Sequence, residues 1–257
     1  MARAARLQWG AWLGLAGGLA LICGAGAADG LALERLWQPA ALAVVVGGAL
    51  AAVLVETPVS GLRLAAALLR WVFATPALTP RAQLDIVLRW SWVARREGIL
   101  ALDAETARQR DPFVAKALQL LVDGRSAEAI RRSMEVELEA EARRLQRAVG
   151  VYESLGGYAP IFGMLGAVLG LIRATSALAD PARLGPAIAA AFVATVYGLA
   201  LANLFCLPVA ERLRGIVQDT LQARRLVLEG VVAIAEGDNP HRIRERLTGY
   251  CRAQAAA

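Results

Sequence analysis

The sequence predicts an all-α integral membrane protein with four transmembrane helices, the third and fourth of which extend into a small cytoplasmic helical domain. Apolar residues form 57% of the 257-residue chain and charged residues only 19%, a balance typical of membrane proteins. The charges are also unevenly placed, because four long runs contain no ionisable residue: 7–28, 36–55, 154–172 and 184–210. Each run has about the 20 residues that a membrane-spanning helix needs.

These runs divide the chain into two pairs of membrane helices, each followed by a charged segment. The pairs occupy residues 1–56 and 151–210, and the charged segments are a cytoplasmic helical domain at 57–150 and a cytoplasmic helix with a tail at 211–257. The four membrane helices are expected at about 8–28, 36–56, 153–178 and 185–210.

The first run has a second interpretation as a signal peptide. Arg3 and Arg6 precede an apolar stretch that ends in small residues, as they would in a signal peptide. The stretch is long for that class, however, and a second apolar run follows within a few residues. We therefore interpret 7–28 as a retained membrane helix.

The distribution of basic residues predicts the orientation. Residues 57–150 hold fifteen of the 28 basic residues, and the segment after 210 holds eight more. Because positively charged segments stay in the cytoplasm, both termini and the middle domain are expected inside, with short outer loops at about 28–38 and 180–184. This topology explains the net charge of +6 better than nucleic-acid binding does, since the arginines lie next to the membrane helices.

Local signals set the limits of the first helical elements. The second membrane helix begins near Pro39, in a favoured first-turn position, and ends at 56–58. Two amphipathic stretches follow at 59–73 and 81–97, separated by the turn-forming dipeptides Thr75-Pro76 and Thr79-Pro80.

The later elements are longer. Asp111-Pro112 predicts a helix start and Asp123-Gly124 a helix end. Residues 126–148 contain no glycine or proline and predict one charged helix, with a favourable pair of Glu139 and Arg143, that continues into the third membrane helix. The fourth is expected to continue through 211–236 and to stop at 237–240.

The sequence contains no motif typical of an enzyme active site or a metal site. Cys23 and Cys206 lie inside apolar runs, no cysteine pair has metal-binding spacing, and His241 is the single histidine. There is also no nucleophile–base pair and no phosphate-binding glycine loop. We therefore predict no catalytic residue, no metal site, no cofactor and no enzyme activity.

Small residues follow one another at helical spacing in both of the last two membrane helices. The fourth carries Ala190, Ala194, Gly198 and Ala202, and the third carries Gly163, Gly166 and Gly170. Such stripes let helices approach closely in lipid, where packing replaces the hydrophobic effect. They indicate either tight packing within one subunit or an interface with a partner helix.

No Asp, Glu, Lys, Arg or His lies at the centre of any membrane helix, although ion pathways usually contain an ionisable relay. The polar groups at membrane depth are Thr175, Ser176, Thr195, Tyr197 and Asn203. If the protein conducts an ion, these groups line the path and the titrating carboxylate comes from another chain. The sequence therefore predicts an obligate partner.

Two prolines lie near the inner ends of the last two membrane helices. Pro160 follows Gly156-Gly157, and Pro208 closes the fourth membrane helix. A proline within a helix leaves one backbone carbonyl without its usual donor. Each is either a simple kink, which membrane helices tolerate, or a hinge or exposed carbonyl beside the ion path.

Three stretches carry a resemblance to a known family. Residues 156–172 (GGYAPIFGMLGAVLGLI) and 180–213 (DPARLGPAIAAAFVATVYGLALANLFCLPVAERL) resemble the third and fourth membrane helices of the MotA/PomA flagellar stator family. The stretch at 94–103 (ARREGILALD) is similar to the family's charged cytoplasmic segment. The resemblance covers roughly 75–250 together with the two-helix start.

The resemblance implies an ion-conducting stator subunit of the flagellar motor in the bacterial inner membrane. Such proteins form a ring of five around two MotB-type subunits, each of which has one membrane helix with an essential aspartate. Ion flow turns the ring, whose cytoplasmic domain pushes on the rotor protein FliG. The lipid bilayer is then a further partner, and nucleic acid is not.

The resemblance also assigns residues. Pro160 and Pro208 match the two functionally important prolines. Together with Ala167 and the mid-helix polar residues Thr195 and Tyr197, they are the expected residues of the ion path. For contact with the rotor, Arg95 and Asp103 match the family's charged positions, and Arg96 and Glu97 are nearby candidates. These four charges would otherwise be interpreted as a solvated helix face.

Ala167 indicates the coupling ion. Sodium-driven relatives have a threonine at this position, and an alanine offers no oxygen to a dehydrating cation, which prefers oxygen ligands. Thr195 alone makes a poor cage. We therefore expect proton coupling, with sodium as the less favoured ion.

Three other functions compete with this one. A TolQ/ExbB-type motor typically has three membrane helices and an outer N-terminus, which the N-terminal helix pair and the inner Arg3 and Arg6 argue against. A carrier usually shows repeated halves, broken helices and buried charge, and none is visible. A purely structural scaffold would tolerate replacement of Thr195 and Pro160.

Overall fold

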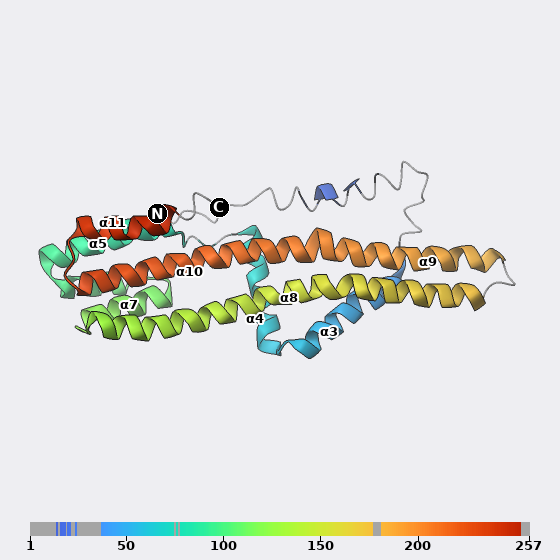
Figure 1. The fold of residues 1–257 in the computed structure, drawn as a ribbon, viewed down its shortest axis with the longest axis horizontal. Coiled ribbons are helices and arrows are strands. Elements are labelled where there is room, and N and C mark those ends of the chain that lie inside the picture. Colours follow the sequence, from blue (N-terminus) through green and yellow to red (C-terminus); the bar gives the residue numbers. More distant parts are fainter. Residues whose placement is uncertain are drawn as a thin grey trace. The chain divides into compact units, whose positions relative to one another are not determined.

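The computed structural model describes residues 37–176 and 181–252 apart from Thr75 and Ala77, together with Gly14, 16–18, Ala20, Leu21 and Gly24 in the N-terminal apolar run. The side chains of 181–183, 251 and 252 are not described. The described residues are almost entirely helical (Figure 1), which confirms the predicted all-α class. They fall into two compact units, one formed by 37–74 and 146–214 and the other by 76–145 and 215–252.

Three helices in the described part are long and apolar enough to cross a membrane. They are Pro39–Glu56, Ala127–Ser176 and Leu184–Ala235. These correspond to the second, third and fourth predicted membrane helices, including the predicted extension of the last two into charged sequence. The predicted first membrane helix, at about 8–28, and most of the outer loop at 28–38 lie outside the described residues. The division of the chain at residues 56, 150 and 210 stays a prediction.

The first unit contains the apolar parts of these helices. In chain order it comprises α2 (Pro39–Leu42), a π-helical turn (Ala43–Gly47), α3 (Gly48–Glu56), α4 (Val59–Phe73), the C-terminal half of α8 (Ala127–Ser176), α9 (Pro181–Ala200), a second π-helical turn (Leu201–Cys206) and the start of α10 (Leu207–Ala235). We call it the membrane unit.

The helix that runs from α2 to α3 shows how sequence sets both its limits and its packing. Pro39 occupies the first turn, where its missing N–H costs nothing, and the helix ends at Glu56 before an extended Thr57 and Pro58. Val45, Ala49 and Val53, spaced four residues apart, are fully buried, whereas Val55 is 91% exposed. Only one narrow stripe therefore packs against protein, and the remaining apolar surface is free to face lipid.

The second unit, which we call the charged unit, has its own core. It comprises α5 (Pro80–Glu97), a 3₁₀ turn (Ile99–Leu102), α6 (Asp103–Thr106), α7 (Pro112–Val122), the N-terminal part of α8, the C-terminal part of α10, and α11 (Pro240–Arg252). Its fully buried side chains include Trp90, Leu118, Met134, Leu226 and Ile243, each from a different helix. A shared apolar core thus holds five helices together.

Predicted helix limits in this unit are confirmed. The Asp111 side chain accepts a hydrogen bond from the Phe113 N–H at 2.9 Å and caps α7. Gly124, at a φ of 70°, follows the end of α7 in a conformation that suits glycine. Glu139 and Arg143 form the predicted pair along α8, at 3.7 Å. The last long helix stops at Ala235, next to the predicted stop at 237–240, whereas α11, which begins at Pro240, was not predicted because this segment was interpreted as a tail.

Glu229 of α10 is the centre of an ion network in the charged unit. It pairs with Arg131 of α8 and, at 2.9 Å, with Arg246 of α11. Arg246 also lies 3.3 Å from Glu236. Burial opposes ionisation of Glu229, but the hydrogen bonds and positive charge of the two arginines outweigh it and hold the pKa of this carboxyl below its ordinary value.

Replacing Glu229 by glutamine is expected to loosen α11. The change leaves two arginines without their shared partner and should cost about 2 kcal/mol of local stability, equivalent to roughly thirtyfold faster amide exchange in α11. Hydrogen exchange of the purified protein measures this. Glu128→Gln is the matched control, because the one ion pair of Glu128 with a described residue is to Arg132, at 3.9 Å on an exposed surface, and its loss should change little.

The same network sets a pH dependence. Because the pKa of Glu229 is lowered in the folded protein, its contribution is complete above the ordinary glutamate pKa of about 4.3 and is lost as the pH falls through the lowered value. Exchange in α11 should accelerate in that acidic range, and less so in Glu229→Gln. Equal acid sensitivity in both proteins would show that Glu229 does not hold α11.

Candidate functional site

The two small-residue stripes pack against each other inside the chain. A Cβ atom added to Gly163 would lie 3.0 Å from the Ala194 carbonyl oxygen, and one added to Gly198 would lie 2.6 Å from the Ala159 carbonyl oxygen. Further along, a Cβ added to Gly170 would lie 2.7 Å from the Ala191 side chain. Only glycine allows backbones to approach so closely. Of the two interpretations of these stripes, tight packing within one subunit is the one seen here.

Pro160 lies at this crossing. Its Cα is 3.1 Å from where a Cβ of Gly198 would be, and the ring is half-buried. The α8 helix continues through Pro160 without interruption from Ala127 to Ser176. Because proline has no N–H, the Gly156 carbonyl lacks its normal donor four residues on. The structure therefore places a helix weak point where α8 and α9 are in closest contact.

Pro208 lies at a different kind of irregularity. It is the second residue of α10 and is exposed, and the six residues Leu201–Cys206 before it form a π-helical turn. Such turns are rare and often occur at functional sites. Neither this turn nor the one at Ala43–Gly47 was predicted from the sequence. The only signal was Pro208 itself, which cannot donate to the carbonyl four residues earlier.

Ala167 and Thr195 border the contact between α8 and α9. A Cβ added to Gly166 would lie 2.8 Å from the Ala194 Cβ, and Ala167 and Thr195 are the next residues of the two helices. Both are half-buried. Beyond them, the two helices present exposed apolar side chains, among them Ile161, Met164, Val168, Phe192 and Val196. Ala167 and Thr195 thus lie next to the interhelix contact, on helices whose exposed side chains in this region are apolar.

Tyr197 connects α9 to the start of the second membrane helix. Its hydroxyl oxygen accepts a hydrogen bond from the Gln38 backbone N–H at 3.1 Å. That N–H precedes the first turn of α2 and has no partner within the helix. Tyr197 therefore has a clear structural role at the predicted ion path.

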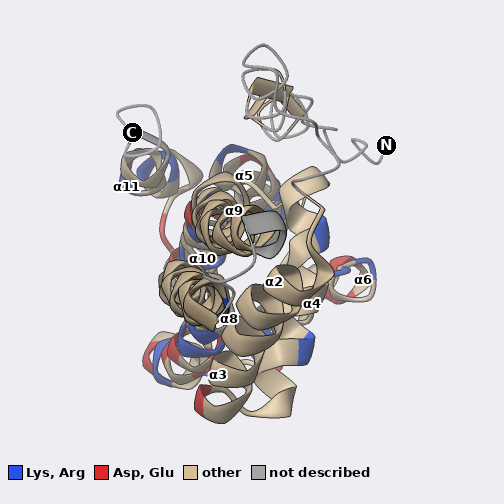
Figure 2. Ribbon diagram, turned by 90° about the vertical axis from the view of Figure 1, so that its right-hand side faces the viewer, with Lys and Arg blue, Asp and Glu red and all other residues tan. Residues whose placement is uncertain are grey.

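Charged residues of the membrane unit lie outside its apolar stretches at 39–55, 154–172 and 184–210. Glu56, the last residue of α3, accepts hydrogen bonds from the Ser154 hydroxyl at 3.1 Å and the Tyr158 hydroxyl at 3.4 Å. Arg214 pairs with Glu153 and Glu211. The α2 helix carries no charged residue (Figure 2), and 154–172 and 184–210 contain none either. Within these stretches the chain offers hydroxyls but no carboxylate.

Arg212 is a feature that the sequence analysis did not single out. Its Nε and one of its terminal nitrogens are buried and find no hydrogen-bond partner among the described residues. Leaving a buried guanidinium without a partner is costly. Arg212 lies one helical turn after Pro208, so both unusual features occur in the same stretch of α10.

The four predicted rotor-facing charges lie in the charged unit. Arg95, Arg96 and Glu97 form the end of α5, and Asp103 begins α6. All four side chains are exposed, and none makes an ion pair or hydrogen bond to another described residue. Between them, Gly98 adopts a φ of 90° and turns the chain sharply. These charges are therefore available to a partner.

Taken together, the glycine-packed apolar helices and their uncharged stretches define an integral membrane protein, and the charges of the charged unit that no described residue pairs are available to a partner. Known proteins with similar sequences belong to one family. The sequence profile described as the "MotA/TolQ/ExbB proton channel family" matches residues 105–226. Motility protein A of Bacillus subtilis is 35% identical over 88% of this chain and 84% of its own length. Chemotaxis protein PomA of Vibrio alginolyticus is 32% identical over 93% of both chains.

Solved structures agree with the sequence relatives. The fold matches a chain of the flagellar MotAB stator complex from Bacillus subtilis with a TM-score of 0.85 and 33% identity, covering 95% of this chain and 96% of that one. It matches C. jejuni MotAB with a TM-score of 0.89 and 26% identity over 95% of each chain. The chain belongs to the MotA/TolQ/ExbB proton channel family, and within it to the MotA/PomA flagellar stator branch.

This assignment confirms the predicted family and function. The protein is a membrane-embedded stator subunit of the flagellar motor, and its family is a channel and stator family rather than an enzyme class. The relatives named for motility favour the flagellar branch over the TolQ/ExbB alternative.

Proposed function

We propose that this stator subunit conducts protons together with a MotB-type subunit and converts their flow into torque on the rotor. The observation that carries the proposal is the lack of any carboxylate at 39–55, 154–172 and 184–210. A proton relay at membrane depth needs a titrating group. An aspartate in the single membrane helix of a MotB-type partner supplies it, in line with the MotAB composition of the similar solved complexes.

The assembly we propose is a ring of five copies around two MotB-type chains in the bacterial inner membrane, with both termini in the cytoplasm. The exposed apolar face of α8 and α9 gives such a ring its contact with the partner helices. The excess of arginine at 57–150 and after 210 supports the orientation.

Within this ring, the ion path runs along the face bordered by Ala167 and Thr195. Pro160 and Pro208 supply the free carbonyls and the local flexibility that a cycle of protonation requires. Tyr197 holds the start of the second membrane helix against α9. Proton coupling follows from Ala167, which leaves Thr195 as the one side-chain oxygen beside the α8–α9 contact at 166–167 and 194–195.

The subunit transmits torque to the rotor through four charged residues, Arg95, Arg96, Glu97 and Asp103. Their side chains are exposed and unpaired among the described residues, and they extend from a short segment of the charged unit. Charges of both signs allow complementary contact with a charged rotor surface, for which FliG is the proposed partner.

The ion choice is tested by swimming speed in cells whose only stator contains this subunit. Wild-type cells should swim equally fast at low and high external sodium and should stop when a protonophore collapses the proton gradient. Ala167→Thr, which adds an oxygen beside Thr195, should make speed respond to sodium. Ala51→Thr on the exposed face of α3 is the matched control and should not.

Two results would contradict proton coupling. One is wild-type swimming that rises with external sodium. The other is wild-type swimming that persists after the proton gradient has been collapsed while a sodium gradient remains.

A further inference from the structure

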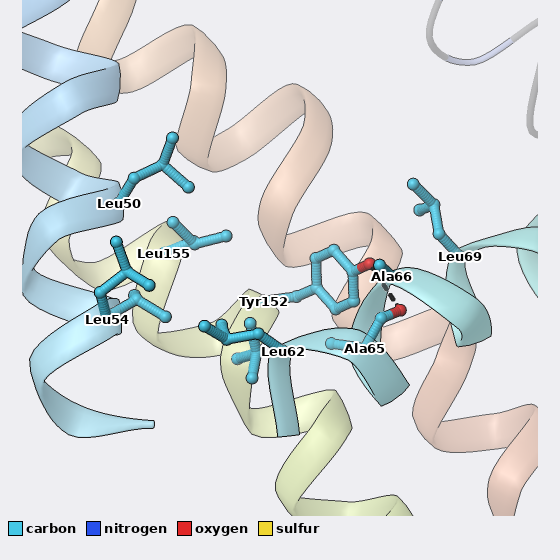
Figure 3. A pocket seen from close by; sticks show the side chains of 10 residues that line it. Leu50, Leu54, Leu62, Ala65, Ala66, Leu69, Tyr152 and Leu155 are labelled. Atoms are coloured by element: carbon cyan, nitrogen blue, oxygen red, sulfur yellow. Dashed lines mark hydrogen bonds between the residues drawn. The ribbon is translucent and has the colours of Figure 1, made fainter. Parts of the chain in front are cut away.

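An apolar groove lies in the membrane unit between α3, α4 and α8. Its volume is about 390 Å³, and its lining is almost purely hydrocarbon. Leu50 and Leu54 of α3 form one side, Leu62 and Leu69 of α4 form the other, and Tyr152 of α8 lies between them (Figure 3).

A hydrogen bond holds the groove in shape. The Tyr152 hydroxyl donates to the Ala65 carbonyl at 2.9 Å and thereby joins α8 to α4 (Figure 3). This contact uses the phenol hydroxyl, the one polar side-chain group of the lining. The groove is thus preformed and offers no side-chain hydrogen bond to an occupant, which must itself be apolar along this length.

The groove opens toward lipid. Leu50 and Leu54 line it and are still 46% and 58% exposed, and they continue the exposed apolar surface of α3, a membrane-spanning helix. A hydrocarbon chain in the bilayer can therefore enter from the side without crossing a polar surface. A soluble metabolite would find nothing polar in the lining to bind.

Two cations lie beside the groove. Arg63 and Arg70 directly follow the lining residues Leu62 and Leu69, and because they are seven residues apart they lie on one face of α4. Both are exposed, neither forms an ion pair with a described residue, and α4 contains no acidic residue. An amphipathic helix with free arginines next to a membrane helix attracts anionic headgroups.

We propose that this groove binds one acyl chain of an anionic phospholipid, whose phosphate lies against Arg63 and Arg70. The lipid comes from the leaflet in which α3 ends. This site depends on the membrane insertion of the chain but not on its coupling ion or its contact with the rotor, so it can fail while the proposed function holds.

The test is photolabelling of the full chain, purified with its partner subunit, by a phosphatidylglycerol that carries a diazirine in its acyl chain. We expect labelled peptides from α4 and from α8 around Tyr152. Ala66→Phe fills the groove from an exposed lining position, and it should reduce this labelling about tenfold, the effect of losing roughly two buried methylene groups.

The matched control is Ala67→Phe, since Ala67 is also exposed on α4 but does not line the groove. Its labelling should equal that of wild type. The double variant Arg63→Gln/Arg70→Gln should keep the groove but lose the preference for phosphatidylglycerol over phosphatidylcholine in competition.

Three results would overturn the proposal. The first is equal labelling in Ala66→Phe and wild type, which would mean nonspecific surrounding lipid only. The second is equal competition by the two lipids in wild type. The third is a groove that does not label because a second copy of the chain covers it, which crosslinking between copies at Leu62→Cys would show.

Discussion

Replacing Gly198 by leucine is expected to abolish motility by preventing α8 and α9 from packing. A Cβ at this position would lie 2.6 Å from the Ala159 carbonyl oxygen and 3.1 Å from the Cα atoms of Gly163 and Pro160. All three neighbours are backbone atoms of a continuous helix and cannot rotate away. The cost should therefore reach or exceed the upper end of overpacking effects, about 3 kcal/mol.

Two readouts check this prediction: the amount of folded protein extracted from membranes and the fraction of swimming cells. Both should fall sharply in Gly198→Leu. Gly157→Leu is the control. Gly157 lies on α8 close to Ala159 and Pro160, but a Cβ there would meet no atom within 4 Å. Its protein level should match that of wild type. Normal swimming of Gly198→Leu would contradict the packing described here.

Replacing Pro160 by leucine should also abolish motility, but unlike Gly198→Leu it should leave the fold intact or more stable. Leucine restores an N–H to the interior of α8, which allows the Gly156 carbonyl to complete its helical hydrogen bond. Removing an interior proline can stabilise a helix by up to about 3 kcal/mol. We therefore expect normal or higher protein levels, normal assembly and no swimming.

A second proline provides the control. Pro186 lies inside α9 and is exposed, so Pro186→Leu makes the same chemical change in the neighbouring helix, away from the crossing at Gly198. Cells with this variant should swim. If Pro160→Leu cells swim as fast as wild type, Pro160 is only a tolerated kink and has no role in the ion path.

The elements of this fold could be predicted because they depend on local properties. A lack of charge over about 20 residues identified the second, third and fourth membrane helices. The absence of glycine and proline at 126–148 predicted the long charged part of α8. The capping residue Asp111 marked the start of α7, and the turn signal at Thr79-Pro80 marked the start of α5.

What could not be predicted depends on contacts between distant residues. The small-residue stripes indicated close packing, but only the position of Ala159 against Gly198 shows that they meet within one chain. The groove beside Tyr152 requires three helices whose arrangement no spacing reveals. The two buried guanidinium nitrogens of Arg212 had no sequence signal, since an arginine after a membrane helix normally suggests only orientation.

For the candidate site, too, some features were predicted from the sequence and others came only from the structure. Arg95, Arg96, Glu97 and Asp103 were found through a family resemblance, and the structure adds that they are exposed and unpaired among the described residues. Their contact with the rotor stays a prediction, as do the ion-path roles of Pro160, Pro208, Thr195, Tyr197 and Ala167.

The central claim, that this chain is a flagellar stator subunit, is tested most directly by deleting its gene in a strain that lacks every other stator and scoring tethered-cell rotation. Cells of the deletion strain should carry normal flagella that do not rotate, and the wild-type gene supplied in trans should restore rotation. Rotation that continues in the deletion strain would contradict it.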